Sequence, residues 1–454
     1  MESTVVLNDD GGNPDTGCVS GTLKEANVSL NGIGWIDFSS EHRDRIWTAL
    51  DLLAKPGVVD ELGIGPIRDA LADKIFPGIS TIQTRPKYFS LVPLLLRQYQ
   101  LEELRRPNPR SVDEYLRVRE RECRAIMVKA AETESNGKTD QTGIIGATFE
   151  DDLDRGVVRR PSSIYWNGLR TFRIFSPPAL SLVEFGERLR ESRHARFRLS
   201  LEAPGDDWDA QDEELGLYVM VPSLVDPKTY WDTLSIALLS EEAEFLQQQI
   251  VTSQPDSMLA HLLFDLSTIE TKRMLDQVDS FHDFLDFPMV RSLKSSDPEL
   301  LSILTLAGDF SDLLYGAHIR YNCLLQKRFG TERKCAEFNQ LWEEWVDRIL
   351  PVQERFRVDR LWELTRSVGV AVRGYTKAFV ETWITNCHSR VLDIFDRIVT
   401  KQEIDNKSGR ARLHPNAKES VSDWIGLRRL DYRFSRVRVL VRDIRDALHA
   451  QEVQ

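Results

Sequence analysis

Residues 303–324 read ILTLAGDFSDLLYGAHIRYNCL, and this stretch decides the expected fold. Its apolar residues recur at alternating spacings of four and three, the pattern of a helix with one buried face. The stripe consists of Ile303, Ala307, Phe310, Leu314, Ala317, Tyr321 and Leu324. Gly308 and Gly316 lie beside the stripe and allow a neighbouring backbone to come close. A coiled-coil dimer would also use such a stripe, but a few turns among other helical segments favour a bundle within the chain.

Other segments carry the start and stop signals of amphipathic helices. Ser111 and Glu114 have the spacing of a capping box, which predicts a helix over 112–131. Further helices are expected over 41–53 and over 67–75, each followed by a Pro-Gly pair. The last long helix is expected to present one apolar face made of Leu427, Leu430, Phe434, Val437, Val441, Ile444 and Leu448.

Residues 143–175 differ in character, because short β-prone pieces alternate with turn signals there. Candidate strands lie at 144–145, 157–158, 164–166 and 171–175, with Asn167-Gly168 as a hairpin turn. The pattern predicts a small α/β module, for which a winged-helix arrangement is one option shared with many unrelated modules.

The expected fold class is therefore mainly α, with this small α/β module and a C-terminal helical bundle. Composition divides the chain into an acidic disordered tail (1–32), an N-terminal helical region (33–135), the α/β module (142–201), an acidic linker (202–216) and a C-terminal helical domain (217–454). The linker is the sharpest boundary, because residues 202–214 contain seven acids and no base.

Composition also limits the classes of function. The net charge of −12 argues against a protein that coats nucleic acid with its whole surface, so any such contact must be local. The cysteines are odd in number and show no Cys-x-x-Cys pair, which favours reduced thiols. No apolar run approaches the ~20 residues of a membrane helix, and the acidic start is unlike a signal peptide. We expect a cytoplasmic protein without a membrane partner.

Two segments combine cations and aromatic rings beside apolar runs. The first is TRPKYF at 84–89, and the second spans 159–175. Cations can meet phosphates, and rings can stack on bases, so we predict a contact with DNA or RNA. The predicted contact residues are Arg85, Lys87, Tyr88, Phe89, Arg159, Arg160, Tyr165, Trp166, Arg170 and Arg173. The alternative is that the rings belong to the core and the cations only flank it.

Seven arginines between Arg428 and Arg445 form a second basic run, interleaved with Asp431, Asp443 and Asp446. On a helical projection they point in several directions, which favours a salt-bridged face over a surface for nucleic acid.

The sequence shows no motif for catalysis, cofactor binding or metal binding. Phosphate-binding glycine loops, the His-Glu-x-x-His zinc motif and a nucleophile elbow are all missing, and the eight histidines are scattered. The acids at 206–214 precede the strand-like residues 215–221, which loosely suits a metal-dependent nuclease, but the lysine that such a strand would carry is missing. A solvated linker is the simpler interpretation.

Four motifs, GWIDFS (34–39), TRPKYF (84–89), PSSIYWNGL (161–169) and LDYRF (430–434), resemble those of an uncharacterised bacterial family known only as a domain of unknown function. The resemblance spans most of residues 34–448. It implies genes encoded beside helicases, methyltransferases and phage-defence genes, and it implies no reaction and no catalytic residue.

We therefore expect a non-catalytic interaction or nucleic-acid-associated subunit of a bacterial defence assembly, with other subunits of that assembly as protein partners. A divergent metal-dependent nuclease and a helical scaffold that self-assembles through the 303–324 stripe are the alternatives.

Overall fold

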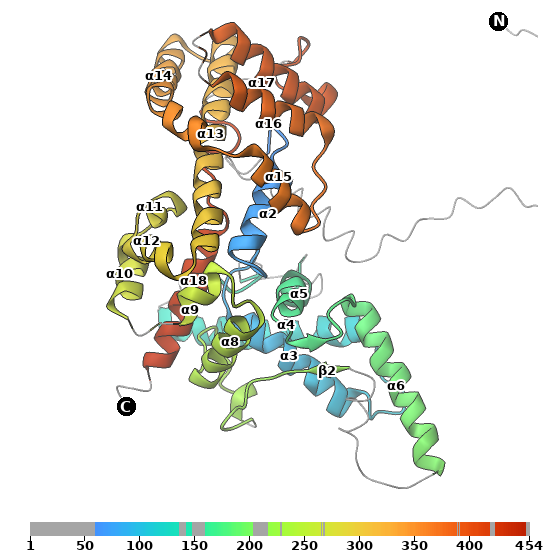
Figure 1. Cartoon of the computed structure of the whole chain (residues 1–454). Helices are drawn as coiled ribbons and strands as arrows, with labels where there is room; N and C mark the ends of the chain where they lie inside the picture. Colours follow the sequence, from blue (N-terminus) through green and yellow to red (C-terminus); the bar gives the residue numbers. More distant parts are fainter. Residues whose placement is uncertain are drawn as a thin grey trace, which may run out of the picture.

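The computed structural model describes residues 60–135, 142–147, 159–202, 217–227, 229–264, 266, 268–387, 389, 391–417 and 423–450 (Figure 1). In this part the first half of the chain forms α2 (Gly65–Ile75), α3 (Lys87–Gln98), the π-turn η1 (Tyr99–Glu103), α4 (Val112–Ser135), α5 (Pro161–Thr171), β1 (Phe175–Ser176), α6 (Leu182–Glu202) and β2 (Tyr218–Val219). The second half forms η2 (Thr229–Trp231), α8 (Ser240–Ser253), α9 (Met258–Phe264), α10 (Ile269–Gln277), α11 (Phe281–Leu285), α12 (Pro288–Ser296), α13 (Pro298–Phe329), α14 (Glu332–Arg355), α15 (Val358–Ser367), α16 (Gly374–Asn386), α17 (Leu392–Lys407), η3 (Ser408–Arg410) and α18 (Phe434–His449). The expected mainly helical class with a small β part is confirmed.

α13 is the long helix on which the upper half of the molecule is built (Figure 1). The Asp297 carboxylate accepts a hydrogen bond from Leu300 N at 2.9 Å and caps its first turn. The predicted stripe is buried from Ile303 to Tyr321, and α14 and α17 pack along it. A Cβ on Gly316 would lie 2.2 Å from the Trp345 ring, so only glycine allows α14 so close. The prediction of a bundle within the chain is confirmed.

In the part of the chain that the structure describes, α13 is also the one helix long and apolar enough to cross a membrane by length and composition. Of its most apolar 18-residue window, 72% is buried inside the protein. Core helices of soluble proteins pass the same test.

The predicted hairpin at 164–175 is wrong, because residues Pro161–Thr171 form helix α5. Pro161 stands in the first turn, where its missing N–H costs nothing, and Gly168 sits inside the helix instead of in a turn. Gly168 lies against the Gly78 carbonyl and the Phe89 ring, so tertiary packing has overridden the local turn signal. The sheet of the described residues is one antiparallel pair, Phe175 with Val219 and Ser176 with Tyr218, which is too short for the wing of a winged helix.

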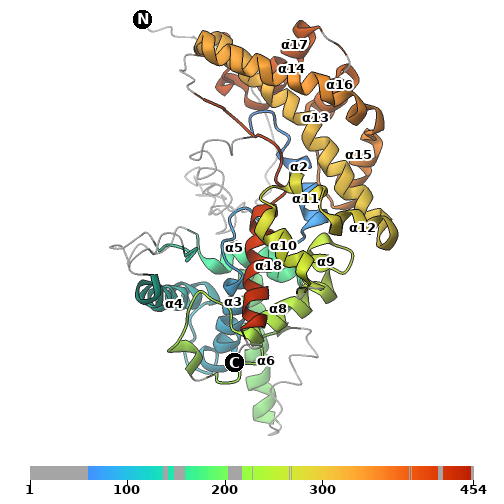
Figure 2. The same cartoon turned by 90° about the vertical axis from the view of Figure 1, so that its left-hand side faces the viewer.

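α18 begins at Phe434, later than the apolar pattern predicts. Tyr432 and Arg433 have positive φ angles of 48° and 69°, which interrupts the helix and leaves Leu427 and Leu430 in the preceding loop. Figure 2 shows α18 upright near the centre of the molecule, with α10 close to its upper end and α8 beside its lower part. It contacts α8 along much of its length.

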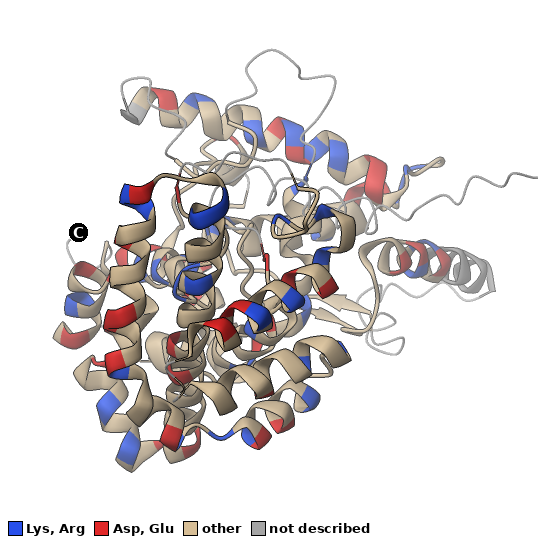
Figure 3. Cartoon of the chain, turned by 90° about the horizontal axis from the view of Figure 1, so that it is seen from above, with Lys and Arg blue, Asp and Glu red and all other residues tan. Residues whose placement is uncertain are grey.

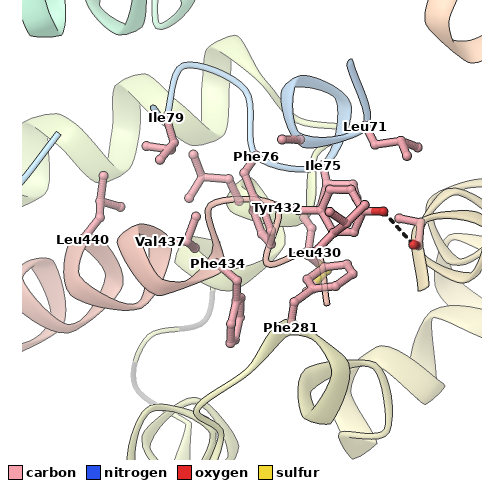
Figure 4. Packing of buried hydrophobic residues seen from close by; sticks show 14 of the residues in the cluster. Leu71, Ile75, Phe76, Ile79, Phe281, Leu430, Tyr432, Phe434, Val437 and Leu440 are labelled. Atoms are coloured by element: carbon pink, nitrogen blue, oxygen red, sulfur yellow. Dashed lines mark hydrogen bonds between the residues drawn. The ribbon is translucent and has the colours of Figure 1, made fainter. Parts of the chain in front are cut away.

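The core joins segments that are far apart in the sequence (Figure 4). Phe76 lies 6.3 Å from Phe281 and 6.2 Å from Phe434, measured between ring centroids. The Tyr432 hydroxyl donates to Ala307 O of α13 at 2.8 Å. The first described helix, the middle of the chain and its last helix therefore share one interior.

Several expectations fall outside the described residues, namely the acidic tail, the helix at 41–53, the strand at 157–158 and nearly all of the acidic linker. The division into domains stays a prediction. Helices from different predicted domains do pack together, since α8 contacts α3, and α2 contacts α13 and α15. The helices predicted over 67–75 and 112–131 are confirmed as α2 and α4.

Candidate nucleic-acid interface

The two basic and aromatic segments do meet in space, but their rings form part of the core. α3 carries the first set and α5 the second, and the two helices pack together. Tyr165 lies 5.3 Å from Tyr88 and 4.8 Å from Phe89 between ring centroids. Tyr88, Phe89 and Tyr165 are at most 1% exposed. They cannot stack on bases in this structure, and their role is to join α3 to α5.

Hydrogen bonds fix the same rings from their polar ends. The Tyr165 hydroxyl accepts from Thr84 N at 2.8 Å and from Arg85 N at 3.1 Å, and it donates to Arg85 O. The Tyr88 hydroxyl accepts from Ile145 N at 2.9 Å. Burial raises the pKa of Tyr165 to about 12, so this hydroxyl keeps its proton at neutral pH.

Trp166 belongs to a neighbouring stack on the other side of α5. Its ring lies 3.8 Å from that of Phe175, nearly parallel, and Phe185 of α6 packs 5.9 Å away. Its indole N–H donates to Leu180 O at 3.1 Å. The stack ties α5 to the start of α6 and leaves Trp166 only 7% exposed.

The cations of the first segment are held by carboxylates from distant parts of the chain. Arg85 Nε lies 2.6 Å from Asp443 Oδ2 of α18, and its Nη1 donates to Thr142 O. Lys87 Nζ lies 2.6 Å from Glu242 Oε2 of α8, with both side chains at most 2% exposed. Glu242 also accepts from the Tyr230 hydroxyl at 2.9 Å, so both of its carboxylate oxygens have partners.

Arg159 and Arg160 lie at the N-terminus of α5, where Arg159 is buried and Arg160 pairs with Asp113 of α4. Glu120 Oε1 accepts from Ser162 N at 2.6 Å and so caps the helix from 42 residues away. Burial raises the pKa of Glu120 to about 7, against the lowering effect of Arg160. These charges serve to seat α5 on α4.

Arg170 and Arg173 lie at the other end of α5, and Arg173 is the one predicted cation that is exposed. Arg170 is half-buried, with its Nε bonded to Pro178 O. Arg188 of α6 is exposed nearby. Both Arg170 and Arg188 lie close enough to Glu184 to affect its ionisation. The pKa of Glu184 is lowered first by hydrogen bonds from Ser181 and further by the charges of Arg188 and Arg170.

Sequence reasoning missed the arginines of α6. Residues 159–202 contain nine arginines, no lysine and four glutamates, a net charge of +5 in a chain of −12, so the rest of the chain carries −17. This excess of arginine over acidic residues is the sequence feature that could have pointed to α6. We define the basic strip as Arg170, Arg173, Arg188 and Arg190, the arginines at the end of α5 and the start of α6 whose exposure the structure describes.

The arginines near the C-terminus serve a different purpose. Arg438 and Arg442 of α18 both donate to Leu275 O near the end of α10, and Arg445 donates to Leu266 O. Arg433 pairs with Asp69 and Asp73 of α2. The run therefore does form ion pairs, as predicted, and Arg428, Arg429 and Arg442 are exposed, but several of its arginines also fasten α18 to its neighbours. Seen from above, cations and carboxylates are interspersed along the described helices (Figure 3).

A second group of buried charges surrounds Glu61, just before α2. Glu61 pairs with Lys407 of α17, and Glu403 accepts from the Tyr321 hydroxyl at 2.8 Å. His318 is fully buried beside them, and desolvation lowers its pKa. Glu61, Glu403, Tyr321 and His318 are at most 1% exposed, so a substrate cannot reach them and the group fastens α2 to α13 and α17.

No metal site emerges in the described ranges, where no three His, Cys, Asp or Glu side chains are grouped to hold an ion. The acids proposed for a nuclease, at 206–214, lie outside those ranges. Cys123, Cys323, Cys335 and Cys387 are free thiols, and burial raises the pKa of Cys323 to about 11 and that of Cys387 to about 12. Neither of these two thiols is poised as a nucleophile at neutral pH.

Comparison with known families identifies the family of the chain. A model of a family of unknown function, DUF6361, matches residues 30–447, which is most of the chain. The chain belongs to the DUF6361 family. The match runs from before α2 into the last turn of α18, and the family description names no reaction. No curated protein and no solved structure matches this DUF6361 chain.

Proposed function

We propose that the protein is a non-catalytic subunit that binds the phosphate backbone of nucleic acid through the basic strip. The observation that carries the proposal is the local charge of residues 159–202, a net +5 in a molecule that is otherwise strongly acidic. An acidic body repels polyanions, so a single basic element would both attract nucleic acid and fix its orientation.

Two features support phosphate as the target. All the cations of this segment are arginines, whose planar guanidinium forks match phosphate oxygens better than the point charge of lysine. Arg173 and Arg188 are also exposed, whereas the cations of the α3 segment are tied to carboxylates. Of the contact residues predicted at 84–89 and 159–175, the proposal keeps Arg170 and Arg173. It adds the arginines of the basic strip on α6.

The setting of this function is a bacterial antiviral assembly in the cytoplasm, with other subunits as protein partners and no membrane. This part of the proposal rests on the resemblance of the motifs to a family encoded beside helicases, methyltransferases and defence genes.

The test is the charge-reversal variant R173E/R188E, measured by fluorescence anisotropy on a labelled 25-base-pair DNA at several salt concentrations. We expect a weakening of roughly tenfold or more and a shallower dependence of the affinity on salt, since each lost phosphate contact removes about one unit of slope. R333E/R348E on α14 is the control, because Arg333 and Arg348 are the exposed partners of nearby glutamates far from the strip in sequence. Equal affinity of all three proteins would refute the proposal.

A further inference from the structure

We infer that Arg173 is the anchor of the basic strip, the residue whose guanidinium fork holds one phosphate of the nucleic acid and so fixes where the strand lies. The inference rests on the proposed function and names the residue that directs it. Its basis is the backbone of Arg173, which has a φ angle of 53° at the end of α5. Glycine adopts this left-handed conformation freely, whereas a residue with a Cβ is strained in it.

The turn that ends α5 is one in which glycine is the usual residue. Arg173 N donates to Arg170 O and Ile174 N donates to Leu169 O, both at 3.0 Å. These two bonds define a Schellman motif, with Arg173 in its left-handed position. That position most often holds glycine, so the arginine runs against the preference of the local backbone.

The end of the helix does not need the side chain of Arg173. Each of the last four carbonyl oxygens of α5 already has a partner. The pairs are Gly168 O with Phe172 N, Leu169 O with Ile174 N, Arg170 O with Arg173 N, and Thr171 O with Gln254 Nε2. Within the described ranges the exposed guanidinium of Arg173 forms no hydrogen bond and no ion pair. Its N–H donors are therefore open to a ligand.

Arg433 shows what the same conformation achieves elsewhere in this chain. Its φ angle is 69°, and its guanidinium pairs with Asp73 and donates to Ile79 O at 2.6 Å. Those internal bonds offset the strain of the backbone and fasten the start of α18 to α2. Arg173 has the same backbone conformation without internal bonds, so we assign its compensating contact to a ligand.

The backbone that carries Arg173 is held firmly on both sides. Its neighbours Phe172 and Ile174 are fully buried, and Ile174 O accepts from Met220 N at 2.7 Å beside the β1–β2 pair. The Phe172 ring covers Gly78, where a Cβ would lie 2.7 Å from it. A guanidinium on a fixed base loses less freedom on binding than one on a mobile loop, and this preorganisation favours a tight contact.

The experiment compares R173G with R433G, which change the same residue type in the same backbone conformation. Circular dichroism gives the melting temperature of each variant, and fluorescence anisotropy gives its affinity for the labelled 25-base-pair DNA. We expect R173G to melt at the temperature of the wild type or about 1–2 °C above it, and to bind DNA about five- to tenfold more weakly. R433G is expected to melt at a lower temperature and, while folded, to bind DNA as the wild type does.

Two further variants test the fork and the fixed base. R173K keeps the charge beside the end of α5 but loses the planar fork, so we expect it to bind DNA more weakly than the wild type. R188A removes an exposed arginine from an ordinary helical position, and we expect a smaller loss than in R173G, about two- to threefold.

The outcomes separate the anchor from the function of the strip. A melting temperature of R173G below that of the wild type would overturn the inference, because the side chain would then serve the fold. Full binding by R173G or R173K, or a larger loss in R188A than in R173G, would overturn it as well. In those cases the proposed function stands as long as R173E/R188E weakens binding. Failure of the wild type to bind DNA would overturn the proposed function itself.

Discussion

Glu120 shows how a single residue sets the position of α5. Its carboxylate is buried, receives the N–H of Ser162 and lies near Arg160. Ionising a buried carboxyl costs free energy, because the charge loses its hydration. Desolvation therefore raises the pKa of Glu120 to about 7, while Arg160 and the hydrogen bond from Ser162 N lower it. This group is one of the contacts that orient α5, and with it Arg170 and Arg173, together with the rings that join α5 to α3.

Glu120 makes the stability of the protein depend on pH. Its pKa is about 7 in the folded state against an ordinary value of 4.5, so between these values the folded protein binds more protons than the unfolded chain. The free energy of unfolding therefore falls as the pH rises through this window. E120Q keeps an acceptor oxygen without a charge, and we expect it to be more stable than the wild type at about pH 8 by roughly 1–3 kcal/mol.

Urea unfolding of the wild type and E120Q at several pH values checks this expectation. E122Q is the matched control, because Glu122 lies two residues along α4 and is exposed. Parallel pH profiles for the wild type and E120Q would show that Glu120 does not titrate in this window.

At the scale of elements, glycine contacts decide how closely helices approach. Gly316 is covered by the ring of Trp345, whose indole N–H donates to Asp312 O at 2.8 Å, so α13 and α14 are fixed both by contact and by a hydrogen bond. A methyl group at Gly316 cannot be accommodated unless the tryptophan moves.

We expect G316A to lower the free energy of unfolding by about 1–3 kcal/mol, because overpacking outweighs the gain in helix propensity. G374A is the control: Gly374 opens α16, has an ordinary φ angle, and a Cβ there meets nothing within 4 Å. Thermal unfolding followed by circular dichroism compares the two. A G316A protein as stable as G374A would mean that Trp345 has room to move.

The elements that the sequence predicts correctly are those whose signals are local. α13 and α4 carry long apolar stripes and caps within the helix, and both form as expected. α5 does not, because its β-prone residues and its Asn-Gly pair are overruled by Glu120 and by the contact of Gly168 with Gly78 O, neither of which is visible in the local sequence.

Contacts between residues far apart in the sequence also limit how well the interface can be predicted. Sequence reasoning identified the two basic and aromatic segments, which the structure places against each other on α3 and α5. It could not show that Lys87 is neutralised by Glu242, 155 residues away, or Arg85 by Asp443, 358 residues away. Whether a cation is free depends on such long-range partners. The strip on α6 was open to detection, since its excess of arginine is a property of the sequence alone.

At the scale of the whole molecule, α18 packs against elements that are far from it and from one another in the sequence. Five of its side chains are buried in the common core: Phe434, Val437, Leu440, Val441 and Ile444. At roughly 2 kcal/mol for each buried apolar side chain, their loss would cost about 10 kcal/mol, comparable with the total stability of many proteins.

A chain that ends after Arg433 is therefore expected to lack a cooperative thermal transition and to exchange the amide protons of α8 and α9 rapidly, as measured by hydrogen exchange and mass spectrometry. Removal of residues 451–454 alone is the control. A truncated chain that melts cooperatively near the temperature of the full chain would show that α18 is dispensable for the core.

The ion pairs of Arg433 with Asp73 and of Arg85 with Asp443 span 360 and 358 residues. During synthesis, α2 and α3 leave the ribosome long before their partners exist, at a pace of ~5–20 residues per second. For tens of seconds the nascent polypeptide holds Lys87 and Phe76 without the groups that will cover them. We therefore expect the first half of the protein to complete its folding only after translation of α18 ends.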